Sequence, residues 1–168
     1  HSQLLFTMLE DLLPGENLAE LGIQAIAYGC GPGSFTGLRI AASAVQCLAY
    51  SCNLPAIALS TLSVLAQSAW RRGDVGACDT VLCTIDARIS EVYSAVYAYE
   101  DNLAVLQEGP WACAPSDLSP AESGSLCAVG SGCHFLDVFP LGLRAKIRSC
   151  TPDLLPTDVT GVQVYDDR

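Results

Sequence analysis

The chain opens on a helical pattern of apolar positions. Over residues 1–13 the apolar side chains recur every three or four residues, which predicts an amphipathic helix. The residues that set this spacing are Leu5, Met8, Leu9 and Leu12. Pro14-Gly15 should end the helix, because proline cannot continue it and glycine suits the turn that follows.

Short apolar runs and helical stretches then alternate along the chain. The runs at residues 23–28 and 56–59 are typical of buried strands, and residues 36–52 between them have helical spacing. Ser60 or Thr61 can cap a further helix that extends to about Arg72. This alternation favours an α/β layer with at least one parallel strand pair.

The pattern changes after residue 73. Residues 91–99 alternate between two faces, as a strand does, and residues 88–90 would link them to a strand at 80–86. A third strand at 103–107, after a turn at 100–102, would complete a meander. Beyond it we expect a loop at 110–124, a strand at 126–129 and a short helix at 132–139. These changes predict two lobes, one over residues 1–72 and a smaller one over residues 73–168.

Composition limits the kind of protein this can be. Of its 168 residues 51% are apolar, yet no apolar run reaches the ~18 residues of a membrane span. No basic segment precedes an apolar one as in a secretory signal, so we expect a cytoplasmic protein. The net charge is −10 and the eight Lys and Arg residues are scattered. Strong unaided binding of nucleic acid is therefore not expected, whereas an acidic surface would suit a basic protein partner.

The nine cysteines do not form a metal-binding pattern. Zinc sites usually contain closely paired cysteines such as CxxC, and the closest pairs here, Cys47 with Cys52 and Cys78 with Cys83, are too widely spaced. We expect these residues to be small buried side chains or free thiols.

A glycine-rich segment over residues 29–37 lies between a predicted strand and a predicted helix. Backbone N–H groups in such a place can bind an anion. The simpler interpretation is a tight turn, in which Ser34 or Thr36 caps the helix. No lysine follows the last glycine, as a P-loop requires, and the spacing GxGxxxG differs from the dinucleotide-binding fingerprint.

This segment also carries a resemblance to a known family. The run from Gly31 to Gly37 and the following Arg39 closely resemble the signature of the TsaB (YeaZ) family. The motif residues are Gly31, Pro32, Gly33, Ser34, Phe35, Thr36, Gly37 and Arg39. Leu54-Pro55, Ser60-Thr61-Leu62, Ile85-Asp86-Ala87-Arg88 and Glu91-Val92-Tyr93 resemble the same family, and the match extends to about Leu103.

The resemblance implies an α/β fold of the actin-like, sugar-kinase-like type, with a ribonuclease H-like motif and two lobes. The family begins with strands that carry an Asp-Thr motif, and no such segment precedes His1. We therefore expect a truncated fold, in which residues 1–72 are the remainder of the first lobe.

The resemblance further implies a non-catalytic subunit that dimerises with TsaD, the catalytic paralogue, in the synthesis of threonylcarbamoyladenosine in tRNA. TsaD carries a His-x-x-x-His metal site just after the second strand. This chain has no histidine between Ser60 and Leu65, so neither a catalytic residue nor a metal site is expected. The other implied partners are a TsaE-like ATPase in the complex and a second copy of the chain when it is alone. Contact with tRNA would be indirect, and no cofactor is expected in the isolated chain, with ATP or ADP at the TsaD interface.

The two predicted helices are candidates for the partner interface. Small and apolar residues surround most of the helix at 36–52, which would let it be buried on two sides. In the family these helices contact TsaD and form the homodimer. The interface residues we predict are Leu5, Met8, Leu9, Leu12, Leu38, Ala41, Ala42, Val45 and Ala49. The alternative is that both helices are buried within their own subunit.

Two other functions stay open at this point. One is a nucleotide- or phosphate-binding hydrolase that uses the glycine turn and Asp86, which lies with Arg88 at a predicted strand end. In the simpler interpretation Asp86 pairs with Arg88 or caps the turn. The other is a regulatory homodimer without TsaD.

Overall fold

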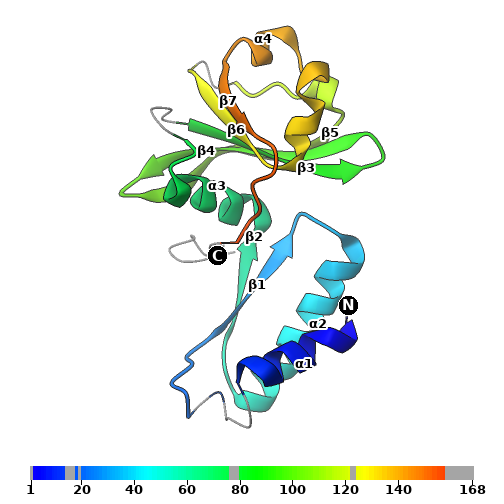
Figure 1. The fold of residues 1–168 in the computed structure, drawn as a ribbon, viewed down its shortest axis with the longest axis vertical. Coiled ribbons are helices and arrows are strands. Elements are labelled where there is room, and N and C mark those ends of the chain that lie inside the picture. Colours follow the sequence, from blue (N-terminus) through cyan, green and yellow to red (C-terminus); the bar gives the residue numbers. More distant parts are fainter. Residues whose placement is uncertain (1, 14–17, 19, 76–79, 122–123, 158–168) are drawn as a thin grey trace. The chain divides into compact units, whose positions relative to one another are not determined.

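A computed structural model describes residues 2–13, 18, 20–75, 80–121 and 124–157 (Figure 1). Its residues group into two compact units. Unit 1 comprises His1–Cys30 with Phe35–Ala58, and unit 2 comprises Gly31–Ser34 with Leu59–Arg168. This grouping differs from the predicted division at residue 72, because helix α3, Thr61–Arg72, lies with the second unit.

Unit 1 contains two helices and a pair of strands. Helix α1 spans Ser2–Leu12 and helix α2 spans Phe35–Cys52, which confirms both predicted helices. Strand β1 spans Ile26–Gly31 and strand β2 spans Ala56–Ser60. The two strands are neighbours in a two-stranded sheet and run in the same direction (Figure 1). Helix α2 connects them in the chain. The predicted helix break at Pro14-Gly15 lies outside the described residues.

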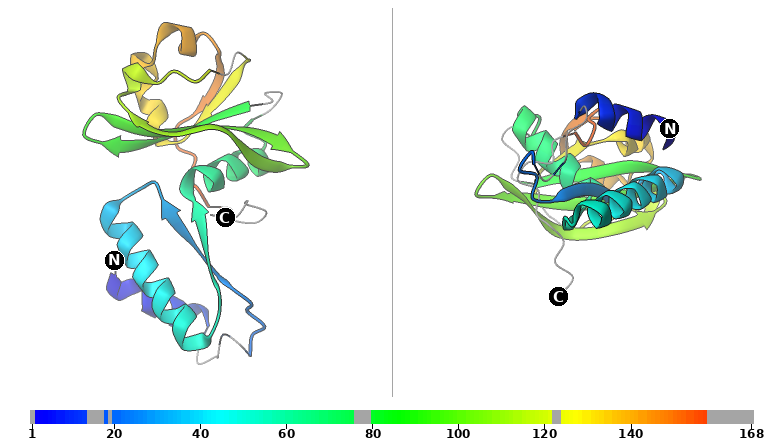
Figure 2. Two further views of the ribbon diagram at one scale, coloured as in Figure 1. Left: turned by 180° about the vertical axis from the view of Figure 1, so that it is seen from behind. Right: turned by 90° about the horizontal axis from the view of Figure 1, so that it is seen from below.

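Unit 2 is built on a five-stranded sheet with the order β5-β4-β3-β6-β7. The strands are β3, Thr80–Arg88; β4, Glu91–Glu100; β5, Leu103–Cys113; β6, Leu126–Val129; and β7, Ile147–Thr151. The first three pair antiparallel, as the predicted meander requires, and β3, β6 and β7 pair parallel. Helix α3 covers one face, and the other is covered by a 3-10 segment, η2, Ser131–Val138, and by α4, Leu141–Arg144 (Figures 1 and 2). A short turn, η1, spans Pro115–Asp117.

The alternation of side chains along β3 builds a core on each face of this sheet. Val81 and Cys83 face α3 and join Leu62 and Leu65 in one fully buried cluster. Leu82, between them, belongs to the opposite cluster with Leu118, Leu126, Phe139 and Leu143. Successive side chains of a strand point to opposite faces, so a run of buried residues here reflects a sheet covered on both sides.

Two sequence expectations for unit 2 need correction. Strand β5 runs on to Cys113, past the predicted end at residue 107 and through Pro110. Ser94 of β4 pairs with Trp111, and Val96 pairs with Glu108. One residue of β4 therefore lies opposite two residues of β5, Gly109 and Pro110, which form a bulge. Since β5 is an edge strand, a proline without an N–H group fits there.

The other correction concerns a helix cap. Ser60 occupies the N-cap of α3 with extended backbone, but its side chain makes no capping hydrogen bond. Strand β7 and helix α4 were not predicted from the sequence. No helix of the described residues is long and apolar enough to cross a membrane.

Candidate functional site

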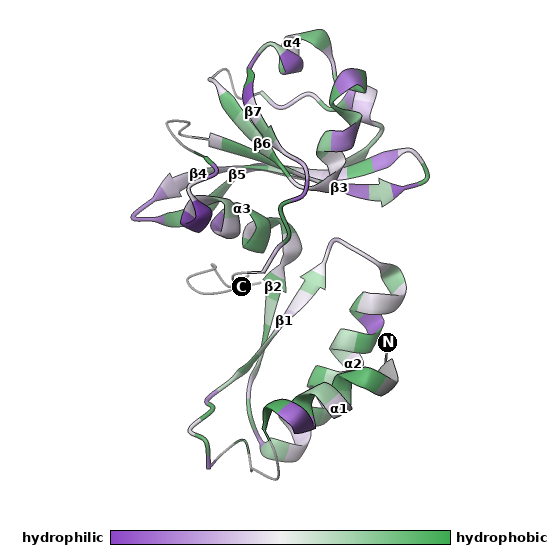
Figure 3. Cartoon of the chain, viewed as in Figure 1, coloured by the Kyte–Doolittle hydropathy of each residue, from purple (hydrophilic) through white to green (hydrophobic). Residues whose placement is uncertain are grey.

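Helix α1 leaves most of its apolar side chains exposed. Met8 and Leu12 are 65% and 75% exposed, and Leu4, Leu5 and Phe6 are exposed as well. Only Leu9 and Leu13 are half-buried. A contiguous exposed apolar surface of this kind marks an interaction site in folded proteins. Figure 3 shows the resulting hydrophobic colouring of α1 and α2.

Helix α2 is partly buried within unit 1, and one of its faces is turned toward α1. Ala44, Val45 and Ala49 are its buried residues. Phe35, Thr36, Arg39, Ser43 and Cys47 are exposed. The helix carries no acidic residue in its first turn and no basic residue in its last, so its ends offer little charge to a partner, and Arg39 is its only charged side chain.

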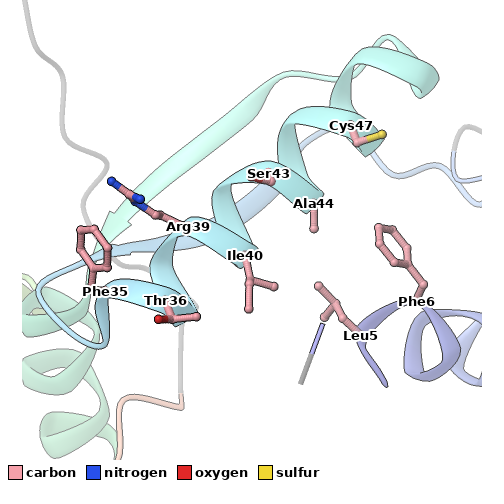
Figure 4. A pocket seen from close by; sticks show the side chains of 9 residues that line it. All are labelled: Leu5, Phe6, Phe35, Thr36, Arg39, Ile40, Ser43, Ala44 and Cys47. Atoms are coloured by element: carbon pink, nitrogen blue, oxygen red, sulfur yellow. The ribbon is translucent and has the colours of Figure 1, made fainter. Parts of the chain in front are cut away.

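A groove of about 540 Å³ lies between these two helices of unit 1. Leu5 and Phe6 project from α1 toward the face of α2 that carries Ile40, Ala44 and Cys47 (Figure 4). Thr36, Ser43, Phe35 and Arg39 complete the lining. Binding sites are typically concave and mostly apolar, with a few polar groups that fix orientation, and this groove has that character.

One end of the groove is formed by Phe35 and Arg39. The guanidinium carbon of Arg39 lies 3.9 Å from the centre of the Phe35 ring, which is within the range of a cation–π contact. Both residues belong to the glycine-rich motif, and so does Thr36. The sequence motif and the helix surface, which were predicted as separate features, therefore meet in one groove.

The opposite side of α2 borders a second hollow of about 670 Å³. It is lined by Ala42, Val45 and Ala49 of α2, by Tyr28 of β1 and by residues 53–56 before and at the start of β2, together with Gln46 and Tyr50. Helix α2 is thus flanked by two hollows within the same unit. This arrangement fits the expectation of a helix that can be covered on two sides.

The structure divides the predicted interface residues into two groups. Leu5, Met8 and Leu12 are exposed on α1, and Leu9, Leu38, Ala41 and Ala42 are half-buried. Val45 and Ala49 are only 9% exposed and belong to the interior of unit 1. Phe6, Ile40, Ala44 and Cys47 line the groove but were absent from the predicted set. For Ile40, Ala44 and Cys47, the spacing of three to four residues along α2 is the signal that would have identified them.

The glycine-rich segment enters α2 through a cis peptide bond between Gly31 and Pro32. Gly31 has a φ of +113°, which favours glycine. Gly33 has no positive φ, and a Cβ added there would meet no atom within 4 Å. The glycine at 31 is therefore required by backbone geometry, whereas the one at 33 is not.

Asp86 is engaged in the turn between β3 and β4. Its Oδ1 accepts a hydrogen bond from the backbone N–H of Arg88 at 2.7 Å, and its own N–H donates to Ser131 Oγ at 3.1 Å. Arg88, Ile89 and Ser90 all have positive φ, so this carboxylate stabilises a tight turn. The simpler of the two sequence interpretations of Asp86 is the one observed.

Residues 60–65, which contain no histidine, form the end of β2 and the start of α3. Leu62, Val64 and Leu65 are buried there, and Ser63 Oγ hydrogen-bonds Tyr97 Oη at 3.0 Å. These side chains build the core of unit 2. Among the described residues, no group of three or more His, Cys, Asp or Glu side chains is placed to hold a metal ion.

Comparison with known proteins gives consistent matches. A family model described as "TsaD: tRNA N6-adenosine threonylcarbamoyltransferase" matches residues 1–122. The chain is 44% identical over 102 residues to a protein of Escherichia coli (strain K12) named tRNA threonylcarbamoyladenosine biosynthesis protein TsaB. That alignment covers 61% of this chain and 43% of the relative. A protein of the same name from Haemophilus influenzae is 38% identical over 93 residues, or 55% of this chain and 38% of the relative.

Solved structures give the same result over more of the chain. A structure described as YeaZ from Pseudomonas aeruginosa superposes with a TM-score of 0.78 at 32% sequence identity. The alignment covers 93% of this chain and 71% of that structure. The chain spans less than half the length of each of the two curated relatives described above.

Proposed function

The chain belongs to the TsaB (YeaZ) family, and from that premise we propose that it is the non-catalytic partner of a TsaD-like subunit in tRNA adenosine threonylcarbamoyl transfer. The likeness to YeaZ also bears out the expected actin-like, ribonuclease H-like α/β fold. The relatives are named for the biosynthesis of threonylcarbamoyladenosine in tRNA, and the proposed subunit serves that reaction as a scaffold.

One observation carries this proposal: an exposed apolar α1 borders an apolar groove against α2. Leu5 and Phe6 supply one wall and Ile40 and Ala44 the other. A helix or a helix pair of the partner would bury these side chains, each worth about 1.5–3 kcal/mol when fully covered. Arg39 would then be the polar group that orients the partner.

The absence of catalysis is the second part of the proposal. Residues 60–65 carry no histidine, and their apolar side chains support the core of unit 2. Asp86, the other candidate carboxylate, already accepts a hydrogen bond from the turn that it caps. Both observations favour a scaffold over a hydrolase.

The remaining partners follow from the same proposal. We propose that ATP or ADP is held at the contact with the TsaD-like subunit rather than by this chain alone, and that a TsaE-like ATPase joins the complex. Contact with tRNA would be indirect, because the net charge of −10 opposes the phosphate backbone. In the absence of TsaD the same groove would serve a second copy of the chain.

Size-exclusion chromatography with light scattering tests the central claim. The chain is mixed with its cognate TsaD-type subunit, and E. coli TsaB with its own TsaD is the positive control. The expected result is a one-to-one complex, with threonylcarbamoyl transfer dependent on both subunits. If the control forms a complex and this chain does not, α1 and α2 are insufficient for binding and the proposal fails.

A further inference from the structure

Two cysteines of unit 2 are brought together by the way the chain leaves β6. Cys150 of β7 is paired in register with Ala128 of β6. Gly130, just after β6, donates its N–H to the carbonyl oxygen of Thr151 at 3.0 Å, and Cys133 donates its N–H to the carbonyl oxygen of Gly130 at 3.0 Å. These bonds hold the start of η2 at the end of β7, so Cys133 lies one turn away from a residue bonded to the neighbour of Cys150.

The two thiols are near enough to influence each other's pKa, and both are free in the structure. The hydrogen bond to Cys150, with burial, raises the pKa of Cys133, while the same bond from Cys133 lowers the pKa of Cys150. Of the two thiols, Cys150 is therefore the one that loses its proton more readily.

The two cysteines also differ in their exposure to solvent. Cys133 is 5% exposed, whereas Cys150 is half-buried and open on one side to solvent. Redox-sensitive cysteines are typically accessible, have thiolate character and lie next to a second cysteine that can resolve the oxidised form. The proposed partner-binding function uses neither residue, since both lie in unit 2 and outside the groove.

We propose that Cys150 and Cys133 form a hydroperoxide-sensitive pair that closes to an intramolecular disulfide. The Cys150 thiolate sulfur attacks one oxygen of the hydroperoxide. The O–O bond breaks, Cys150 becomes a sulfenic acid, and the leaving oxygen takes a proton to depart as water or an alcohol. The Cys133 sulfur then attacks the Cys150 sulfur, the S–O bond breaks, and water leaves with the proton of Cys133. For hydrogen peroxide, two thiols and one peroxide give one disulfide and two waters.

The disulfide would close η2, α4 and β7 into one loop. A cross-link between residues that lie close together in the folded state removes conformational freedom mainly from the unfolded chain. The oxidised protein should therefore have a higher Tm than the reduced protein. Binding of the TsaD-like partner through unit 1 should not change, so this proposal can fail without affecting the proposed function.

Mass spectrometry of the peroxide-treated chain provides the test. The fully reduced 168-residue chain is treated with hydrogen peroxide at limiting concentration, remaining thiols are alkylated, and linked peptides are mapped. The expected product has lost two hydrogens, about 2 Da, and carries a Cys133–Cys150 linkage. In the variant Cys133→Ala, Cys150 should accumulate as a sulfenic acid that dimedone traps.

Two variants complete the design. Cys150→Ala should abolish both the linkage and the dimedone adduct at this site, and Cys47→Ala, at an exposed cysteine of unit 1, should leave the linkage intact. The proposal is overturned if Cys150 is still alkylated by iodoacetamide after Cys47 has been oxidised, or if Cys150 links to Cys83 or to any other cysteine. A dimedone adduct on Cys133 in Cys150→Ala would overturn it as well.

Discussion

At the scale of single residues, Gly130 is a tightly constrained position in the backbone of unit 2. Its φ is +97°, and a Cβ added there would lie 2.5 Å from the carbonyl oxygen of Thr84 and 2.6 Å from Leu65 Cδ2. We predict that Gly130→Ala lowers the free energy of unfolding by about 3 kcal/mol, from backbone strain and from the shift of a β3 carbonyl. Urea denaturation followed by tryptophan fluorescence measures it, since Trp70 and Trp111 both belong to unit 2.

Gly142 is the matched control for this substitution. It lies in α4 of the same unit, and an added Cβ would meet no atom within 4 Å. Because alanine favours a helix over glycine by roughly 0.5–1 kcal/mol, Gly142→Ala should be neutral or slightly stabilising. Equal urea midpoints for the two variants would refute the assignment of strain to residue 130.

A second prediction at the residue scale concerns the fully buried thiol of Cys83. Burial raises its pKa well above that of a free thiol. Above pH ~8.5 the unfolded chain releases this proton and the folded chain keeps it. The unfolded state then binds fewer protons, so the free energy of unfolding falls as pH rises, by up to about 1.4 kcal/mol per pH unit.

Cys83→Ala should remove this part of the pH dependence. The variant is expected to be less stable at pH 7, because it leaves a small cavity, but its stability should fall less steeply between pH 8.5 and pH 10. Urea midpoints across this range measure the slope. Cys47→Ala, at an exposed cysteine, should keep the slope of the parent chain, and identical slopes for all three proteins would contradict the prediction.

At the scale of helices and strands, local signals predicted most of the fold. The bounds of α2 and α3 follow from apolar spacing and from the breakers Pro55 and Gly73, and Gly73 indeed has a φ of +75° at the end of α3. The C-terminal end of β5 could not be predicted, because Pro110 normally interrupts a strand and only its edge position and bulge accommodate it. Strand β7 depends on parallel pairing with β6, which no local pattern reveals.

The groove shows what the spacing of apolar residues along a helix cannot predict. Apolar and small residues surround most of α2, so the sequence indicates that two faces can be covered but not which face meets the unit's own interior. Val45 and Ala49 are covered within unit 1, while Ile40 and Ala44 face α1. The interface that the sequence predicted therefore stays a prediction, and the groove gives it a more specific set of residues.

Substitution at Phe6 tests that set. Phe6 lines the groove and is 51% exposed, so Phe6→Glu should leave unit 1 folded. It would place a carboxylate in an apolar contact, and we predict that affinity for the TsaD-like subunit falls by at least tenfold, about 1.4 kcal/mol or more. Isothermal titration calorimetry measures the dissociation constant, and far-UV circular dichroism checks the helices.

Ile89 provides the matched control for this substitution. It is an apolar residue, 94% exposed, at the turn between β3 and β4 of unit 2. Ile89→Glu makes the same chemical change outside the groove and should bind like the parent chain. The interface would have to be placed elsewhere if Ile89→Glu weakened binding and Phe6→Glu did not.

At the scale of the whole molecule, charge and apolar surface should control different steps of association. A net charge of −10 gives the chain a field that acts over about 10 Å at 0.1 M salt, which accelerates encounter with a basic partner surface. The groove, in contrast, is apolar except for Arg39, Thr36 and Ser43. Contacts of this kind govern how long the complex lasts rather than how fast it forms.

This division of roles gives the last prediction. Raising the salt concentration from 0.05 M to 0.5 M should lower the association rate constant with the TsaD-like subunit on the order of tenfold, while the dissociation rate changes little. Surface plasmon resonance at both salt concentrations measures the two rates. In Phe6→Glu dissociation should be faster because the apolar contact is lost, while the association rate should keep its salt dependence. An association rate that does not respond to salt would show that the acidic surface plays no part in partner encounter.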